Sequence, residues 1–192
     1  WPEGKAILSD AARRVFVRPV RRVKVFFRRE RTVHVAALLA VLLGAAVIRS
    51  AYDFREPEGD EGITYSAFGS SFEWAISNYS LPNNHVFHSL LVYFTTRVLG
   101  SDIWAVRLPA LVGGLLIVLF SYKLFRRWYN KNIGLFVAAL AAGSAYLVYF
   151  STNARGYTIQ AALALLTIYI LDHLLHRPHR RGLLWTGYVL VA

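Results

Sequence analysis

Long apolar runs dominate this 192-residue chain and restrict it to folds that lie in a lipid bilayer. Of its residues, 56% are hydrophobic and 17% are charged. About 20 consecutive apolar residues cross the hydrocarbon core as a helix, in which every backbone polar group is satisfied within the segment. The sequence therefore predicts an all-α integral membrane protein. The expected spans cover about residues 33–50, 103–125, 133–150 and 156–175, and a fifth begins at 183–192.

Basic residues lie beside these runs and give the chain a net charge of +11. Such a charge is also typical of nucleic-acid binding, but clustering next to apolar runs favours contact with lipid headgroups. We predict that residues 1–32 form a basic cytoplasmic juxtamembrane segment, with membrane lipids and no nucleic acid as partners. The chain has no Cys, which excludes disulfides and thiolate metal ligands, and no Met. We expect it to be part of a longer polypeptide, incomplete at its C-terminus.

The positions of the basic loops decide the predicted topology. Loops 123–131 and 176–181 both lie on the cytoplasmic side, as the positive-inside rule requires, only if segment 86–99 does not cross the membrane. A run of about fourteen residues is more typical of an interfacial or re-entrant segment than of a span. We therefore predict an outer loop over 51–102 with interfacial helices, including an amphipathic helix over 63–79. Few charges fall inside the spans, which disfavours a transporter or channel.

Asp60 and Glu61 are adjacent carboxylates in the predicted outer loop. Two carboxylates that point into one site raise the proton affinity of one of them, and such a group can deprotonate a hydroxyl or hold a metal ion. Solvated loop charge is the alternative interpretation, because further acidic residues lie nearby. These are Asp53, Glu56 and Glu58. Spacing alone leaves both interpretations open.

Two histidines and two arginines are also expected on the outer side. His85 and His88 would share one face at the start of a helix, where they can bind Zn²⁺ with a carboxylate or hydrogen-bond a phosphate. Histidines satisfied by interfacial water are the alternative. Arg107 and Arg155 lie near the ends of spans, and guanidinium groups bind phosphate in bidentate fashion. Arginines that reach toward lipid headgroups are the alternative there.

Several short motifs follow one another in an order and spacing that resemble the GT-C glycosyltransferases of the family 39 type. That group includes the protein O-mannosyltransferases and the aminoarabinose transferase of lipid A. The resemblance covers roughly residues 33–176, the N-terminal portion of such an enzyme, and implies a GT-C-type multi-span helical bundle. The motifs are Gly59-Asp60-Glu61, Pro82-Asn83-Asn84-His85, Leu99-Gly100-Ser101, Arg107-Leu108-Pro109-Ala110, and the segment from Tyr149 through Ser151, Thr152, Asn153, Ala154, Arg155 and Gly156 to Tyr157.

The resemblance implies an enzyme that moves a sugar from a polyprenyl- or dolichyl-phosphate donor to a lipid, glycan or protein acceptor. Transfer would take place on the extracytoplasmic face, and we expect a bacterial inner or plasma membrane. Asp60 matches the catalytic acidic position and would act as general base toward the acceptor hydroxyl, with inversion at the anomeric carbon. Glu61 lies beside it as a second catalytic carboxylate.

The remaining site residues also come from the matched motifs. His85 falls where the mannosyltransferases carry a His-Pro-Pro element, although Val86 and Phe87 stand here in place of the prolines. Arg155 and Tyr157 match the motif near the donor phosphate or sugar. The expected substrate-binding residues are His85, His88, Arg107, Arg155 and Tyr157.

Metal use and partner chains are left open by the sequence. Some relatives are metal-assisted and others are not, and a divalent metal would be held by Asp60, Glu61 and His85. The lipid-phosphate sugar is expected as donor substrate. The alternative function is a non-catalytic membrane subunit of a larger complex that retains the same architecture.

Overall fold

Every secondary-structure element in the described part of the chain is a helix. The computed structural model describes residues 18–52, 56, 59–81, 84–176 and 181–191, with side chains from residue 31 onward except at 176–184 and 190. The predicted all-α integral membrane fold is confirmed. The elements are α2 (Arg18–Tyr52), α3 (Gly59–Ile63), η2 (Thr64–Gly69), α4 (Phe72–Ser77), α5 (Val86–Leu99), α6 (Ile103–Trp128), α7 (Lys131–Gly143), α8 (Ala145–Ser151), α9 (Tyr157–His176) and α10 (Arg181–Val191).

The chain divides into two compact units, residues 1–39 and 40–192, each of which is described by itself. In the first unit the described residues belong to α2. The basic segment predicted at 1–32 is therefore helical from Arg18 and continues into the first span, whereas residues 1–17 lie outside the described part. Within α2, the stretch Arg31–Tyr52 has the length and hydropathy of a membrane span.

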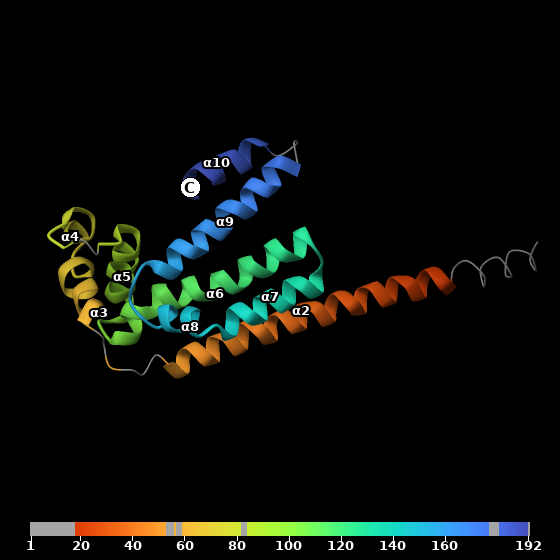
Figure 1. The fold of residues 1–192 in the computed structure, drawn as a ribbon, viewed down its shortest axis with the longest axis horizontal. Coiled ribbons are helices and arrows are strands. Elements are labelled where there is room, and N and C mark those ends of the chain that lie inside the picture. The colour runs from red at the N-terminus through yellow and green to blue at the C-terminus, as the bar shows by residue number, and fades with distance from the viewer. Residues whose placement is uncertain (1–17, 53–55, 57–58, 82–83, 177–180, 192) are drawn as a thin grey trace, which may run out of the picture. The chain divides into compact units, whose positions relative to one another are not determined.

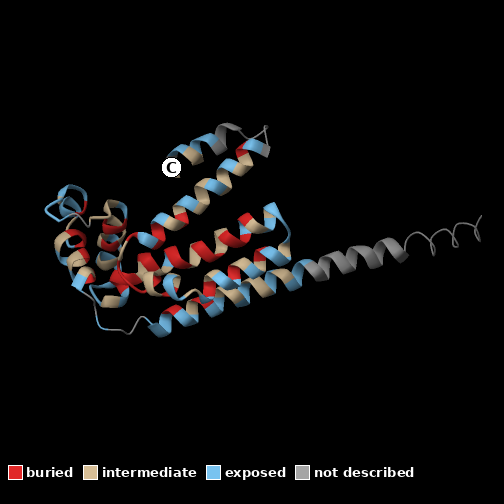
Figure 2. Cartoon of the chain, in the orientation of Figure 1, coloured by how far each residue is buried: buried red, intermediate tan, exposed pale blue. Residues whose placement is uncertain are grey.

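Helix α6 forms the centre of the second unit. It packs against α5, α7, α8 and α9, and α10 packs against α9 (Figure 1). Buried residues recur along most of the length of α6, as Figure 2 shows. Small residues allow the close packing that helices in membranes use. A Cβ atom at Gly113 would lie 2.9 Å from the backbone nitrogen of Ile159, so glycine is required where α6 meets α9.

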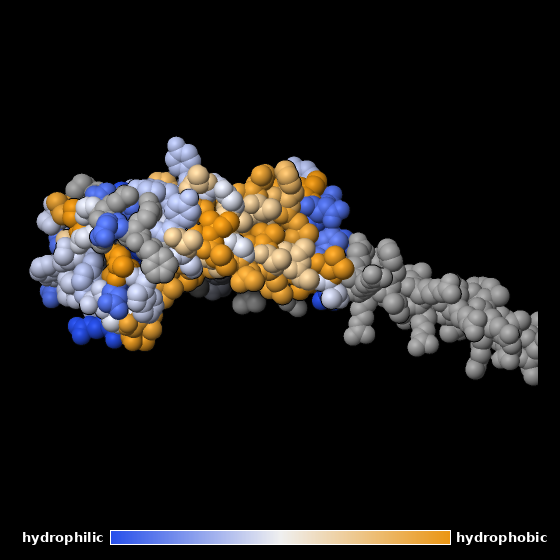
Figure 3. All heavy atoms as spheres, turned by 90° about the horizontal axis from the view of Figure 1, so that it is seen from below, coloured by the Kyte–Doolittle hydropathy of each residue, from blue (hydrophilic) through white to orange (hydrophobic). Residues whose placement is uncertain are grey.

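Two further helices have the length and hydropathy of spans, Ile103–Trp128 and Tyr157–Leu175. The continuous span predicted over 133–150 differs from the structure, because α7 and α8 are separate helices bent by 61°. Helix α10 has 11 described residues, so the fifth span stays a prediction. On the face drawn in Figure 3, hydrophobic residues gather over the spans and hydrophilic residues gather over the end that carries α3, α4 and α5.

Short helices replace the single amphipathic helix predicted over 63–79. The chain forms the π-helix η2 and then α4, and the Ser71 hydroxyl begins α4 by accepting a hydrogen bond from the Trp74 amide at 3.1 Å. Asn84 then ties this region to α5. Its side-chain amide donates to the carbonyls of Ala75 and Asn78 at 3.1 and 3.0 Å, while its oxygen accepts from Ser89. Helix α5, with 14 residues, is shorter than the spans, as expected.

Candidate active site

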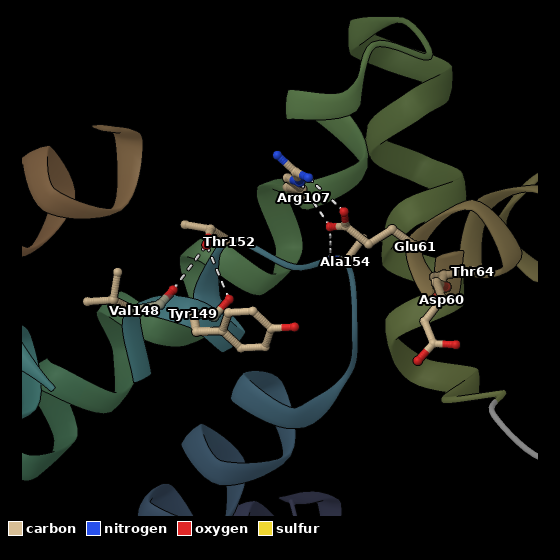
Figure 4. A network of polar contacts seen from close by, with 8 residues as sticks. All are labelled: Asp60, Glu61, Thr64, Arg107, Val148, Tyr149, Thr152 and Ala154. Atoms are coloured by element: carbon tan, nitrogen blue, oxygen red, sulfur yellow. Dashed lines mark hydrogen bonds and ion pairs between the residues drawn. The ribbon is translucent and has the colours of Figure 1, made fainter. Parts of the chain in front are cut away.

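A buried ion pair joins α3 to α6. Arg107 Nε donates to Glu61 Oε1 at 2.9 Å and Arg107 Nη2 donates to Glu61 Oε2 at 2.6 Å, and both side chains are 1% exposed (Figure 4). The Ala154 amide donates to Glu61 Oε1 at 2.7 Å. The carboxylate therefore connects three segments that are distant in the sequence. Both carboxylate oxygens are engaged, so Glu61 is poorly placed to accept a proton from a substrate.

Asp60 lies in a different environment from its neighbour. Its side chain is 46% exposed, and its Oδ2 atom forms an ion pair with Arg155 Nη1 at 2.7 Å. Figure 4 shows the two carboxylates pointing in different directions. The shared carboxylate site expected from their adjacency is therefore not formed. Each carboxylate instead pairs with its own arginine. Among the described residues, none bonds to Asp60 Oδ1.

Arg155 belongs to a segment that joins α8 to α9 and is here called the 151–157 loop. This loop is largely buried, and Ala154 packs with Val92 of α5 and Val106 of α6. Gly156 packs against His85 so closely that a Cβ atom at Gly156 would lie 2.7 Å from the His85 Cγ atom. The loop therefore has little freedom to move within the bundle.

Aromatic contacts extend the site from Arg155 to α5. The Arg155 guanidinium lies 4.9 Å from the centre of the Tyr157 ring, a cation–π contact. The Tyr157 ring meets His85 edge-on at 5.1 Å and Phe150 at 5.2 Å. Burial lowers the pKa of the His85 ring, and the positive charge of Arg155 lowers it further. The structure thus brings Asp60, Arg155, Tyr157 and His85 into one cluster.

His88 does not join this cluster as a metal ligand. Its side chain is 2% exposed, and neither ring nitrogen forms a hydrogen bond of normal geometry. Burial lowers its pKa to about 4, which the Ala154 backbone opposes and the neighbouring His85 reinforces. Within the described residues there is no group of three or more His, Asp or Glu with metal-binding spacing. Asp60, Glu61 and His85, which the sequence offered as ligands in case a metal is used, do not form such a group in the described part of the chain.

The buried His88 predicts a pH-dependent stability. Because its folded pKa of about 4 lies below the ordinary 6.5, the unfolded chain takes up the proton first as pH falls. The contribution of neutral His88 to the free energy of unfolding is therefore fully present above about pH 6.5. It is lost progressively as the pH falls to about 4, and the total loss is at most about 3 kcal/mol. His88→Leu should remove most of this slope, as measured by thermal unfolding of the full-length protein at pH 7 and pH 5. His34→Leu, a partly exposed histidine on α2, should keep it. An unchanged slope in His88→Leu would contradict the assignment.

A cavity of about 640 Å³ opens beside the cluster, between the start of α5, helix α9 and the end of α10. His85 and Gln160 bring polar side chains to its wall, and Gly156 packs against His85 there. The remaining wall is mainly apolar and extends along the membrane-spanning helix α9. Its further lining residues are Val86, Phe87, His88, Ile159, Leu163, Ala164, Thr167, Ile168 and Val191. The cavity can therefore hold a ligand with a long apolar body and a polar end.

Arg49 is one residue to which the sequence analysis gave no role. It is fully buried near the end of α2 and hydrogen-bonds Ser151. The only sequence signal is a cation inside the predicted span 33–50, since charges within spans are costly and need partners. Which partners it finds depends on the tertiary packing.

A comparison with protein families decides between the broad classes left open by the geometry. The family model for dolichyl-phosphate-mannose-protein mannosyltransferases matches residues 84–191. The chain belongs to this family. Membership confirms the resemblance inferred from the motifs and makes this a membrane glycosyltransferase of the GT-C type. No curated protein and no solved structure gave a significant match.

The segment matched by the mannosyltransferase family model includes His85, Arg107, Arg155 and Tyr157. It begins after Asp60 and Glu61. The two carboxylates therefore enter the site through their contacts with matched residues. Asp60 pairs with Arg155, and Glu61 pairs with Arg107.

Proposed function

We propose that the full-length protein is an inverting glycosyltransferase that moves a sugar from a polyprenyl-phosphate donor to a hydroxyl group of a lipid, glycan or protein. The observation that carries this proposal is the partly exposed Asp60–Arg155 pair beside a cavity of about 640 Å³ that runs along α9. A general base, a cation for phosphate and a space for a lipid tail lie next to one another in this arrangement.

Arg155 is the proposed ligand of the donor phosphate. Its side chain is 19% exposed, and its terminal nitrogen Nη1 contacts Asp60. A phosphate oxygen competes with the carboxylate for the guanidinium, because both are anions that accept charge-assisted hydrogen bonds. When the phosphate engages Arg155, the Asp60 carboxylate becomes available for the acceptor. Tyr157 keeps the guanidinium in place through the cation–π contact.

The proposed reaction needs one base and one cation from this chain. Asp60 takes the proton of the acceptor hydroxyl while the hydroxyl oxygen attacks the anomeric carbon of the donor sugar. The bond from that carbon to the phosphate oxygen breaks, and polyprenyl phosphate leaves with the electron pair. Arg155 stabilises the negative charge that develops on the phosphate. Attack opposite the leaving group inverts the anomeric configuration.

Glu61 and Arg107 take positioning roles in this proposal. Their bidentate contact is buried and leaves neither group open to substrate. Glu61 instead accepts the Ala154 amide, next to Arg155 in the chain. The buried pair thus holds the 151–157 loop against α3, which carries Asp60. His85 contributes through its contacts with Tyr157 and Gly156, at the polar wall of the cavity.

The donor tail is proposed to lie in the cavity along α9. An isoprenoid chain is apolar and enters from the bilayer, and the cavity wall offers aliphatic side chains such as Leu163 and Ile168. The basic end of α6, at Arg126 and Arg127, lies at the opposite end of that helix from Arg107. By the positive-inside rule we propose that this basic end is cytoplasmic and the Asp60 end extracytoplasmic.

A transfer assay with the purified full-length protein in nanodiscs tests the function. We expect radiolabelled sugar to pass from a polyprenyl-phosphate sugar to acceptor, and none to pass directly from the matching nucleotide sugar. The product linkage, read by NMR, should have the opposite anomeric configuration to the donor. Retention, or direct use of a nucleotide sugar, would contradict the proposal. Absence of transfer together with co-purification of another membrane protein would favour a non-catalytic subunit.

A further inference from the structure

Arg49 is a fully buried cation that bonds to protein atoms with each of its side-chain nitrogens. Its Nε donates to Ser151 Oγ at 3.1 Å, and Nη1 donates to the carbonyls of Ala45 and Ala142, each at 3.1 Å. Its Nη2 donates to the carbonyl of Ala141 at 3.5 Å. Burying a guanidinium is costly unless its donors are satisfied, and here they are satisfied by neutral oxygens. Arg49 is therefore not available to a substrate phosphate.

Two of the three carbonyls that Arg49 binds, those of Ala141 and Ala142, lie at the break between α7 and α8. In a continuous helix, the carbonyls of Ala141 and Ala142 would accept from the amides of residues 145 and 146. The helix ends at Gly143 and a new one begins after Ser144, so these carbonyls lose those donors. A cation at the C-terminus of a helix also interacts favourably with the helix dipole. Arg49 thus stabilises a 61° bend that lacks a proline.

Ser151 connects this bend to the candidate site. It is the last residue of α8 and the first of the 151–157 loop, and it is fully buried. The contact with Arg49 needs space on α6. A Cβ atom at Gly114 would lie 2.7 Å from Ser151 Cβ and 3.1 Å from Arg49 Nε. Three residues beyond Ser151, the Ala154 amide reaches Glu61, and Arg155 then reaches Asp60.

We infer that Arg49 is a positioning residue that holds the α7–α8 bend and, through Ser151, sets the place of the 151–157 loop. When Arg49 is lost, α7 and α8 can rejoin as a straighter helix, because the freed carbonyls then regain amide donors. The loop moves with the end of α8, and the Ala154–Glu61 and Arg155–Asp60 contacts loosen. The consequence for sugar transfer rests on the proposed function, whereas the consequence for the loop does not.

Hydrogen exchange of the full-length protein in nanodiscs tests the structural part. In Arg49→Met, peptides covering 141–157 should exchange about tenfold faster, while peptides from 115–128 of α6 stay unchanged. Arg49→Lys keeps a donor for the helix-end carbonyls and should recover part of the protection. Arg97→Met is the matched control, because Arg97 is exposed on α5 and should leave both regions unchanged. Unchanged exchange at 141–157, or uniform acceleration everywhere, would overturn the inference.

Ser151→Ala provides a milder variant if Arg49→Met does not fold. It removes the acceptor of Arg49 Nε and should speed exchange in the same 141–157 peptides by a smaller factor, with Arg97→Met again unchanged. Protection at the wild-type level in Ser151→Ala would contradict the role given to this contact.

Kinetics test the consequence for the reaction. We expect Arg49→Met to lower kcat about tenfold to a hundredfold with little change in the KM for the lipid donor, because a displaced loop misplaces the reacting groups. Arg49→Lys should restore part of kcat. Wild-type kinetics in a variant whose loop exchange is accelerated would show that Arg49 does not position the reaction. Inactive wild-type protein with the expected exchange pattern would contradict the proposed function and leave the structural inference standing.

Discussion

Asp60→Asn is expected to lower the rate of sugar transfer by about 10²–10⁴-fold, the usual contribution of a general base. Asparagine has nearly the same size and still offers an oxygen to Arg155, but it cannot take the proton of the acceptor hydroxyl. The fold should be retained, because the contact that stabilises α3 at this position uses the Asp60 backbone carbonyl, which accepts from Thr64 at 3.0 Å. Initial rates with a polyprenyl-phosphate sugar and thermal unfolding of the same sample measure both effects.

Glu73→Gln is the matched control for this substitution. It makes the same change from carboxylate to amide on α4, where the Glu73 side chain is exposed and remote from Arg155 in the sequence. Its rate should stay within about twofold of wild type, since surface changes away from the reacting groups have small effects. Transfer by Asp60→Asn within tenfold of the wild-type rate, with normal unfolding, would remove Asp60 from the role of base.

The second large effect is expected at the buried pair of Glu61 and Arg107. Arg107→Met leaves a carboxylate that is 1% exposed without its cation, and Glu61→Gln leaves an equally buried guanidinium without its anion. Each single change should destabilise the protein by about 3–5 kcal/mol. The double variant should be more stable than the sum of the single changes implies, because neither charge is then left unpaired. Wild type, the two single variants and the double variant form a double-mutant cycle. Chemical denaturation of the full-length protein in detergent measures the free energy of unfolding of all four.

Arg97→Met serves as control for the arginine side of this cycle. It removes a guanidinium that is exposed and contacts the face of the Tyr93 ring at 5.4 Å. The expected loss is within about 1 kcal/mol, as for other exposed cation–π contacts. If the Glu61 and Arg107 substitutions were additive, the two residues would not be coupled and the positioning role of the pair would be wrong.

The membrane spans and the identity of the charged residues near one end of the bundle could be predicted from the sequence. Apolar runs are long enough to cross lipid only in a few places, so α6 and α9 follow from length and composition. Hydrophilic residues that follow such runs gather at their ends, which brings Asp60, Glu61, Arg107 and Arg155 to the same region. These features can be predicted because they depend on the length and hydropathy of each segment and on the charges beside it, which are read directly from the sequence.

The pairing of these charges could not be predicted. Glu61 lies in the short helix α3, where neighbouring side chains point in different directions, so it meets Arg107 while Asp60 meets Arg155. Sequence adjacency had suggested one shared site instead. The bend after Gly143 was also missed, because it has no proline and depends on Arg49 from another helix. Which residues pair in this way is decided by the packing of helices that are distant in the sequence, and such pairing leaves no periodic pattern in the sequence.

A structure of the full-length protein with a bound polyprenyl phosphate tests the central claim most directly, namely that Arg155 and Asp60 form the site of the reacting phosphate and acceptor. We predict density for the phosphate within about 3 Å of the Arg155 guanidinium, a charge-assisted hydrogen bond. The Asp60 carboxylate should be released from the 2.7 Å pair and the isoprenoid should follow the cavity along α9. A phosphate bound elsewhere, with the Asp60–Arg155 pair intact, would contradict it.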